Sequence, residues 1–311
     1  MSTLQKALKD YLALRRALGF ELRKVGHHLQ DFVGFLEREG ASHITTPLAL
    51  RWATQPSRAQ PCWWAGRLSM VRRFAQYVSA ADPGTEVPPQ GLLPHRYHRK
   101  PPYLYSEAHI KQLLQAASQL PSPTGLRPRT YATLLGLLAV TGMRISEPLA
   151  LERDDVDLTQ GVLTIRRTKF GKSRLVTVHP STQCVLSQYA HLRDHVCRMP
   201  RHPNFFISER GTALTQWAVR WTFVRLSRQI GLRGPADRHG PRLHDFRHRF
   251  AVCTLLNWYR AGVDVEQRLP ELSTYLGHVH VTDTYWYLTA TPELLRLATE
   301  RLERADVGCS S

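Results

Sequence analysis

Five side chains from residue 144 onward have types and spacings that suit one kind of chemistry. Arg144 follows a glycine in a Thr-Gly-x-Arg-x-Ser-Glu motif, and His244 and Arg247 form a His-x-x-Arg motif. His278 closes a Leu-Gly-His motif, and Tyr287 stands nine residues further on. Together these residues meet the needs of a phenol oxygen that attacks a phosphodiester.

Each residue type has a definite use in such a reaction. Planar guanidinium groups hold two non-bridging phosphate oxygens at once and offset the negative charge that builds up in the transition state. A histidine moves a proton or donates a hydrogen bond to a phosphate oxygen, and a tyrosine supplies the nucleophile. The pattern therefore predicts phosphoryl transfer through a tyrosine.

In order and spacing these motifs resemble the tyrosine recombinase (phage integrase) family, closely over residues 130–290 and loosely over the whole chain. The resemblance implies that Arg144, Arg247 and His278 stabilise a pentavalent phosphate. It also implies that Tyr287 forms a 3′-phosphotyrosyl link and leaves a free 5′-hydroxyl. Strand exchange in a tetrameric synapse would then pass through a Holliday junction.

The resemblance gives two further residues supporting roles. His244 assists proton transfer, and Glu147, about one helical turn after Arg144, orients that arginine or a neighbouring group. Tyr285 also lies near the position of the nucleophile. The family's spacing after the Leu-Gly-His histidine selects Tyr287 and leaves Tyr285 as a packing residue.

A zinc site is the rival interpretation of the His-x-x-Arg region. His244 and His248 are four residues apart, as in zinc-binding H-E-x-x-H helices, but residue 245 is an aspartate and no third ligand is evident nearby. The chain also lacks a Walker A loop and an acidic cluster for Mg²⁺. A phosphotyrosyl bond conserves the energy of the broken phosphodiester, so rejoining needs no nucleotide. We therefore predict neither a metal nor a cofactor.

Two β-rich runs at residues 162–166 and 174–178 flank a basic turn and predict a hairpin. The resemblance places in such a hairpin the general acid that protonates the leaving 5′-oxygen. Lys169 aligns with that position, and Lys172 stays open as the alternative. Lys172 and Arg174 are expected to contact the DNA backbone.

The charge of the chain predicts a polyanion as its partner. The 311 residues include 42 Lys and Arg against 25 Asp and Glu, a formal net charge of +17 with a pI near 10.2. Residues 1–100 and 101–311 are both basic. We expect both parts to bind double-stranded DNA with an affinity that falls steeply as salt rises. A basic surface that serves only solubility is the alternative.

Periodicity and composition divide the chain into three parts. Apolar residues recur at helical spacing in about four stretches between residues 4 and 80, which predicts a helical domain over residues 1–81. The resemblance implies that this is a core-binding domain. Prolines and basic residues dominate residues 82–102, as expected of an extended linker. Residues 103–311 form the predicted catalytic domain, with a tail helix from about 291. DNA contacts in the first two parts are expected from Arg67, Arg72, Arg73, Arg99 and Lys100.

The predicted fold class is mainly α with a small antiparallel β-sheet. The resemblance implies a helical core-binding domain plus an α+β catalytic domain of the tyrosine recombinase kind, which together clamp duplex DNA. The sequence leaves open whether the tail helix packs on its own chain or docks into a neighbouring subunit. Helices in the catalytic part are expected at about 106–119, 130–141, 144–151, 181–199, 213–229 and 244–259.

Cysteine usage and hydropathy limit the setting of the chain. The five cysteines form no Cys-x-x-Cys pair, and no apolar run is long enough to span a bilayer. We expect a reduced, cytoplasmic protein that does not use a membrane. It is expected to be a monomer when free and a tetramer on DNA, and a need for accessory proteins stays open.

Site-specific recombination or integration of DNA is therefore the predicted function. Two rivals remain at this point. One is an enzyme like a type IB topoisomerase, which cleaves and reseals without exchanging partners. The other is a DNA-binding module without catalysis, in which Tyr287 is structural. The DNA target, and the choice among integration, transposition and resolution, cannot be read from these residues.

Overall fold

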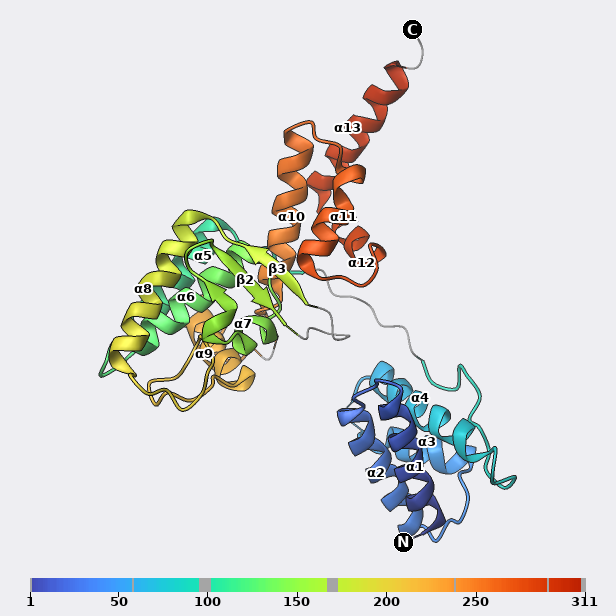
Figure 1. The fold of residues 1–311 in the computed structure, drawn as a ribbon. Helices are drawn as coiled ribbons and strands as arrows, with labels where there is room; N and C mark the ends of the chain where they lie inside the picture. Colours follow the sequence, from blue (N-terminus) through green and yellow to red (C-terminus); the bar gives the residue numbers. More distant parts are fainter. Residues whose placement is uncertain are drawn as a thin grey trace. The chain divides into compact units, whose positions relative to one another are not determined.

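The chain forms two compact units, which Figure 1 draws as ribbons. The computed structural model describes residues 2–57, 59–94, 102–166, 173–237, 239–289 and 291–308, with side chains as far as residue 301. The division between the units falls at Lys100 and Pro101, inside the stretch 82–102 that the sequence marks as a linker. The domain boundaries at residues 81 and 103 stay predictions.

The described residues of the first unit fold into four helices. Their apolar residues recur at helical spacing and meet in one core, in which Leu29, Phe32, Trp52 and Phe74 are completely buried. A proline stands in the first turn of the third and fourth helices, where its missing N–H leaves no hydrogen bond unmade. The helices are α1 (Thr3–Ala17), α2 (Arg23–Arg38), α3 (Thr46–Thr54) and α4 (Pro61–Val78).

The second unit is mainly helical with a small sheet, as Figure 1 shows. Its earlier part contains α5 (Glu107–Ser118), α6 (Leu126–Thr141), α7 (Ser146–Ala150), the 3-10 helix η1 (Arg153–Asp155), β1 (Val156–Asp157), β2 (Val162–Ile165), β3 (Arg174–Thr177), α8 (Pro180–Val196) and α9 (Gln216–Gln229). Its later part contains α10 (Asp245–Arg260), α11 (Val265–Leu276), α12 (Thr282–Tyr285), the 3-10 helix η2 (Trp286–Thr289) and α13 (Pro292–Gly308). The predicted fold class is confirmed.

The sheet is antiparallel with the strand order β1-β2-β3. Ile165 pairs with Arg174, so the hairpin brings Arg174 to the point where the two longer strands begin to separate towards the turn. The turn itself, residues 167–172, lies outside the described part of the chain. The predictions for Lys169 and Lys172 fall there and stay predictions.

Two apolar cores lie within the second unit, and α10 belongs to both. The larger core packs α5, α6, α8 and α9 with the sheet and takes in Phe246 from the first turn of α10. The smaller core takes in Leu255 from a later turn of α10, together with Leu276 of α11 and Tyr287 of η2. Helix α10 therefore runs from one core into the other, as its course in Figure 1 shows.

Several element boundaries differ from the sequence expectation. Helix α6 begins at Leu126, four residues before Thr130, because Gly125 adopts a left-handed conformation and Pro128 fits within the first turn. Helix α11 was not predicted at all, and it contains Pro270 in its interior. Proline is a helix breaker in sequence patterns, which hides such a helix.

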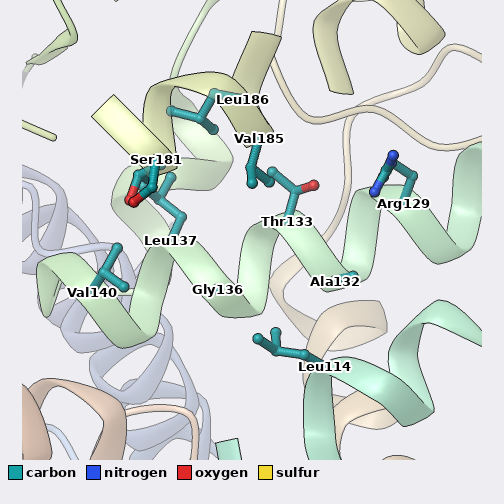
Figure 2. Close-up of a pocket in the computed structure, with 11 residues that line it drawn as sticks. Leu114, Arg129, Ala132, Thr133, Gly136, Leu137, Val140, Ser181, Val185 and Leu186 are labelled. Carbon is teal, nitrogen blue, oxygen red and sulfur yellow. The ribbon is translucent and has the colours of Figure 1, made fainter. Parts of the chain in front are cut away.

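A hollow of about 300 Å³ lies between α6 and α8 (Figure 2). Arg129 and Thr133 of α6 are among its polar wall residues, and Val140 and Val185 are among its apolar ones. None of the residues that line this hollow belongs to the predicted site, so it is not the candidate active site. None of the described helices is long and apolar enough to span a lipid bilayer.

Candidate active site

The guanidinium group of Arg247 forms hydrogen bonds with two glycine-containing motifs, Thr-Gly-x-Arg-x-Ser-Glu and Leu-Gly-His. Arg247 lies in the first turn of α10 and is 1% exposed. It donates hydrogen bonds to the backbone oxygen of Gly142 at 3.0 Å and to that of Leu276 at 2.7 Å. Burial and the nearby Arg144 lower the pKa of Arg247 to about 10, so it remains a cation at neutral pH.

Arg144 is held from two sides. Helix α6 ends at Gly142, which has a φ of +61°, and a Cβ on this glycine would stand 2.7 Å from the ring of Phe250. Just beyond this bend, Arg144 donates from Nη1 to Oε1 of Glu147 at 3.1 Å and from Nη2 to the backbone oxygen of Gly277 at 3.1 Å. Its backbone N–H donates to Oε2 of Glu147 at 2.9 Å. These hydrogen bonds hold the guanidinium group of Arg144 in one orientation.

Glu147 accepts hydrogen bonds from two arginines. Arg174 donates to both carboxylate oxygens of Glu147, at 3.0 and 2.8 Å, in addition to the contacts from Arg144. Burial alone would raise the pKa of Glu147, but the hydrogen bonds and charge of Arg174, followed by those of Arg144, outweigh it and lower the pKa. Glu147 is therefore a buried carboxylate in the neutral pH range.

Arg174 is buried, although the sequence interpretation expected it to face outward. A DNA backbone contact was predicted for it, but its side chain is 10% exposed and its donors are used inside the unit. Besides Glu147, it donates from Nε to the backbone oxygen of Tyr275 at 2.8 Å. This burial disfavours the predicted contact. The sequence does not show the burial, because a pattern of charges in a strand does not reveal which side of the sheet a buried carboxylate occupies.

His278 stands at the start of the turn that follows α11. Gly277, with a φ of +70°, ends the helix, and Nδ1 of His278 lies 2.7 Å from Oγ1 of the completely buried Thr284. Burial first, then the charges of Arg247 and Arg144, lower the pKa of His278 to about 4. His278 is therefore neutral at physiological pH and carries one ring proton.

Tyr287 lies in η2 against the same groups. It is 3% exposed, and its ring is nearly parallel to that of His278 with 6.1 Å between centroids. Its hydroxyl also interacts with the guanidinium of Arg247. Tyr285, by contrast, is 51% exposed and makes no ring contact with these histidines that the structure describes. The geometry places Tyr287, rather than Tyr285, among the site residues.

His244 and His248 complete one wall of the site. The residue His244 is exposed at its surface, immediately before α10, and its ring centroid lies 4.8 Å from that of His248. Desolvation of the His244 ring, followed by the charge of Arg247, lowers the pKa of His244. His248 touches the edge of Tyr287, with 5.5 Å between ring centroids.

Among the described residues, no group of three or more histidine, cysteine or acidic side chains lies close enough together to hold a metal ion. The rings of His244 and His248 do lie close to each other, as their spacing predicts. His248 also contacts the ring of Tyr287, and among the described residues no third ligand of the kind that zinc needs stands beside the pair.

The three arginines that were predicted to bind DNA in the first unit have three different environments. Arg67 is 6% exposed, lies 3.6 Å from the ring centroid of Trp52 and donates to the Trp52 backbone oxygen at 3.0 Å. Arg67 therefore packs inside the bundle in this structure, which disfavours the DNA contact that the sequence predicts for it. Arg72 donates to the backbone oxygens of Pro88 and Pro89, while Arg73 is exposed.

Other predicted residues lie outside the described part of the chain. They are Arg99 and Lys100 of the linker and Lys169 and Lys172 of the hairpin turn. Sequence reasoning also missed residues that the structure brings to the site or its vicinity. Thr284 supports His278, and Tyr105 stacks on Phe246 with 4.7 Å between ring centroids. No sequence signal marks Thr284.

Comparison with known proteins decides the family. The model of the phage integrase family matches residues 104–293. The integrase/recombinase y4rB of Sinorhizobium fredii is 54% identical over 308 residues, which covers 98% of this chain and 98% of that protein. The chain belongs to the phage integrase family. Like other members of this tyrosine recombinase family, it is an enzyme that transfers DNA strands.

Solved structures of DNA-bound integrases share its fold. The Tn1549 transposon integrase in complex with transposon right end DNA is 16% identical, with a TM-score of 0.64 over 97% of this chain and 100% of that one. A lambda integrase tetramer bound to a Holliday junction is 16% identical, with a TM-score of 0.61 over 91% of this chain and 76% of that one. At these identities the likeness concerns the fold alone.

Proposed function

We propose that this chain is a site-specific DNA recombinase that works through a 3′-phosphotyrosyl intermediate. One observation carries the proposal. Arg144, Arg247, His278 and Tyr287 come from separate segments of the chain and meet around the ends of α6 and α11. A DNA-binding module would need no buried tyrosine beside two fixed arginines.

The proposed reaction begins with attack of the Tyr287 oxygen on the phosphorus of a DNA phosphodiester. The bond from phosphorus to the 5′-oxygen breaks, and the 3′-phosphate becomes linked to the tyrosine. Arg144 and Arg247 hold the non-bridging oxygens and offset their growing charge. His278, which is neutral, donates its ring N–H to a phosphate oxygen.

Two proton transfers complete the step. His244, with its lowered pKa, accepts the proton of the Tyr287 hydroxyl. Lys169, in the hairpin turn, donates a proton to the leaving 5′-oxygen. Attack by the 5′-hydroxyl of a second strand on the phosphotyrosine reverses the sequence and rejoins DNA. No bond energy is lost, so the cycle needs neither nucleotide nor metal.

The proposed partner is double-stranded DNA, bound by a tetramer of this chain. The net charge of +17 supports a polyanionic partner, and the lambda integrase of similar fold is a tetramer on a Holliday junction. Helix α9 offers a further surface of suitable composition, since Trp217 and Trp221 are 73% and 47% exposed and Arg225 lies over the Trp221 ring. Both units would bind the duplex, since residues 1–100 and 101–311 are both basic.

Exchange of partners separates a recombinase from a topoisomerase-like enzyme. DNA sites that this chain binds can be selected from random duplexes and placed as two direct repeats in a supercoiled plasmid. We expect excision of the intervening DNA, and no excision with Tyr287→Phe. Relaxation of supercoils that occurs without excision, and without need for the repeats, would instead favour the topoisomerase-like alternative.

A further inference from the structure

Arg174 uses each nitrogen of its guanidinium group inside the second unit. Nη1 and Nη2 donate to the two carboxylate oxygens of Glu147 at 3.0 and 2.8 Å, a parallel two-bond pairing. Nε donates to the backbone oxygen of Tyr275 at 2.8 Å. The side chains of Arg174 and Glu147 are 10% and 4% exposed. The group is thus a buried bridge between strand β3, helix α7 and the end of α11.

This bridge extends to Arg144. Oε1 of Glu147 accepts from Arg174 and from Nη1 of Arg144, while Oε2 accepts from Arg174 and from the Arg144 backbone N–H. Arg144 in turn donates to the backbone oxygen of Gly277. A shift of the Glu147 carboxylate would therefore turn the guanidinium of Arg144 out of its present direction.

The glycine of the Leu-Gly-His motif is shaped around the same side chain. A Cβ on Gly277 would stand 2.8 Å from Nη1 of Arg174, closer than real Cβ contacts come. Arg174 thus lies directly against the backbone that precedes His278, and it also holds the oxygen of Tyr275 two residues earlier. Arg174 therefore contacts Glu147 of the first motif and lies against Gly277 of the Leu-Gly-His motif, although it belongs to neither motif.

We propose that Arg174 is a positioning residue for the strand-transfer reaction. Through Glu147 it fixes the direction of Arg144, and through Tyr275 and Gly277 it fixes the turn that carries His278. Because it begins strand β3, it also ties these groups to the hairpin that β2 and β3 form. This inference rests on the proposed function, since it assigns Arg174 a part in that reaction.

A contact with a DNA phosphate is the alternative role, and the geometry disfavours it. A phosphate would have to draw the guanidinium away from a buried carboxylate, and Glu147 would then lose two of its hydrogen bonds. Lysine cannot take over the bridge, because one ammonium group lacks the planar fork that reaches both carboxylate oxygens and a carbonyl together. Arg174→Lys therefore keeps the charge and removes the geometry.

The test compares Arg174→Lys with Arg166→Lys in the full-length chain. Arg166 lies at the other side of the hairpin, pairs with Asp155 and is exposed, so it is a matched basic control. Single-turnover cleavage is measured at saturating protein on a nicked duplex, and the dissociation constant for the same duplex is measured separately. We expect Arg174→Lys to cleave about tenfold to hundredfold more slowly with its dissociation constant changed less than about twofold. Cleavage by Arg174→Lys within twofold of the wild-type rate would overturn the proposal.

A second variant separates positioning from phosphate binding. Arg174→Gln removes the charge, and binding is measured over a range of salt concentrations. We expect the slope of log affinity against log salt to stay that of the wild type. A slope smaller by about one would indicate a lost phosphate contact and overturn the proposal. Circular dichroism of both variants confirms folding, and Arg174→Lys alone decides the question if Arg174→Gln does not fold.

A double variant tests the route through Glu147. If Arg174 acts on Arg144 through this carboxylate, Arg174→Lys combined with Glu147→Gln should be about as slow as the slower single variant. If the rate reductions of the two single variants instead multiply in the double variant, the two residues act independently, which contradicts the proposal. The proposed function itself fails only if the wild-type chain forms no covalent adduct on the nicked duplex. That result is distinct from an active wild type and an equally active Arg174→Lys.

Discussion

At the scale of residues, the cations of the site are organised by backbone oxygens. A buried cation is costly unless hydrogen bonds compensate its lost hydration. Arg247 receives that compensation from Gly142 and Leu276, and Arg144 receives part of it from Gly277. The two glycine motifs therefore do more than bend the chain, because they present carbonyl groups to the arginines that are proposed to bind the phosphate.

Gly277 gives a prediction about this arrangement. Gly277→Ala would combine a left-handed backbone with a Cβ that collides with Arg174. Gly262 is the matched control, since its φ is +68° and a Cβ there meets open space. We expect Gly262→Ala to cost about 1–2 kcal/mol of unfolding free energy from backbone strain alone. Gly277→Ala should cost about 1–3 kcal/mol more through overpacking and should also slow cleavage. Urea unfolding measures the free energies, and the nicked-duplex assay measures the cleavage rates. If Gly277→Ala lost no more stability than Gly262→Ala and cleaved at the wild-type rate, this account would be contradicted.

His278 gives a prediction about pH. Its pKa is about 4 in the folded chain against 6.5 for an ordinary histidine, so the unfolded chain binds more protons between these values. Stability from this group is complete above pH 6.5 and is lost as the pH falls towards 4. With some allowance for solvent screening, we expect a loss of about 1–2 kcal/mol between pH 7 and pH 4.5. Urea unfolding at the two pH values should show a smaller loss for His278→Gln, and an identical loss would exclude this role for His278.

At the scale of elements, α10 and α13 determine where the tyrosine lies. Helix α10 runs between the two cores of the second unit, and α13 packs against it within the same chain. Leu294, in the first turn of α13, is completely buried in the core that holds Tyr287, and Glu293 pairs with Arg260 of α10. The start of the tail helix is therefore part of the support of η2.

Two neighbouring leucines test this support. Leu294→Ala removes buried side-chain volume and should lower the free energy of unfolding by about 2–4 kcal/mol. Leu295 is 49% exposed, so Leu295→Ala should change it by less than about 0.5 kcal/mol. Chemical unfolding of the two variants at low protein concentration makes the comparison. If both variants unfold like the wild type, the first turn of α13 does not stabilise its own chain.

Elements also show how far the sequence predicts this protein. Motif register is a local property, so the spacing of nine positions from His278 to Tyr287 is enough to predict the nucleophile, and apolar periodicity predicts most of the helices. The direction of a charged side chain is a tertiary property. Arg67 and Arg174 both appear as free cations in the sequence, yet one packs on Trp52 and the other pairs with Glu147. Nothing local in the sequence distinguishes them from exposed Arg73.

At the scale of the whole molecule, the excess of basic residues predicts how DNA binding responds to salt. A protein that neutralises several phosphates releases their counterions, so raised salt weakens binding. We expect the affinity for duplex DNA to fall at least about a hundredfold between about 50 and 200 mM salt. Arg73→Gln should reduce the slope of log affinity against log salt by about one, whereas Arg67→Met should leave it unchanged because Arg67 is buried. Electrophoretic mobility shifts or anisotropy titrations measure these slopes. If Arg67→Met reduced the slope and Arg73→Gln did not, Arg67 rather than Arg73 would be the residue that contacts DNA.

The most direct test of the central claim is a covalent adduct on a nicked duplex that cannot be religated. The wild-type chain should form a protein–DNA adduct that survives denaturing electrophoresis. Tyr285→Phe, the matched control, should form it to the same extent, and Tyr287→Phe should form none while binding the duplex with unchanged affinity. An adduct in Tyr287→Phe, or its loss in Tyr285→Phe alone, would contradict the assignment of Tyr287 as the nucleophile.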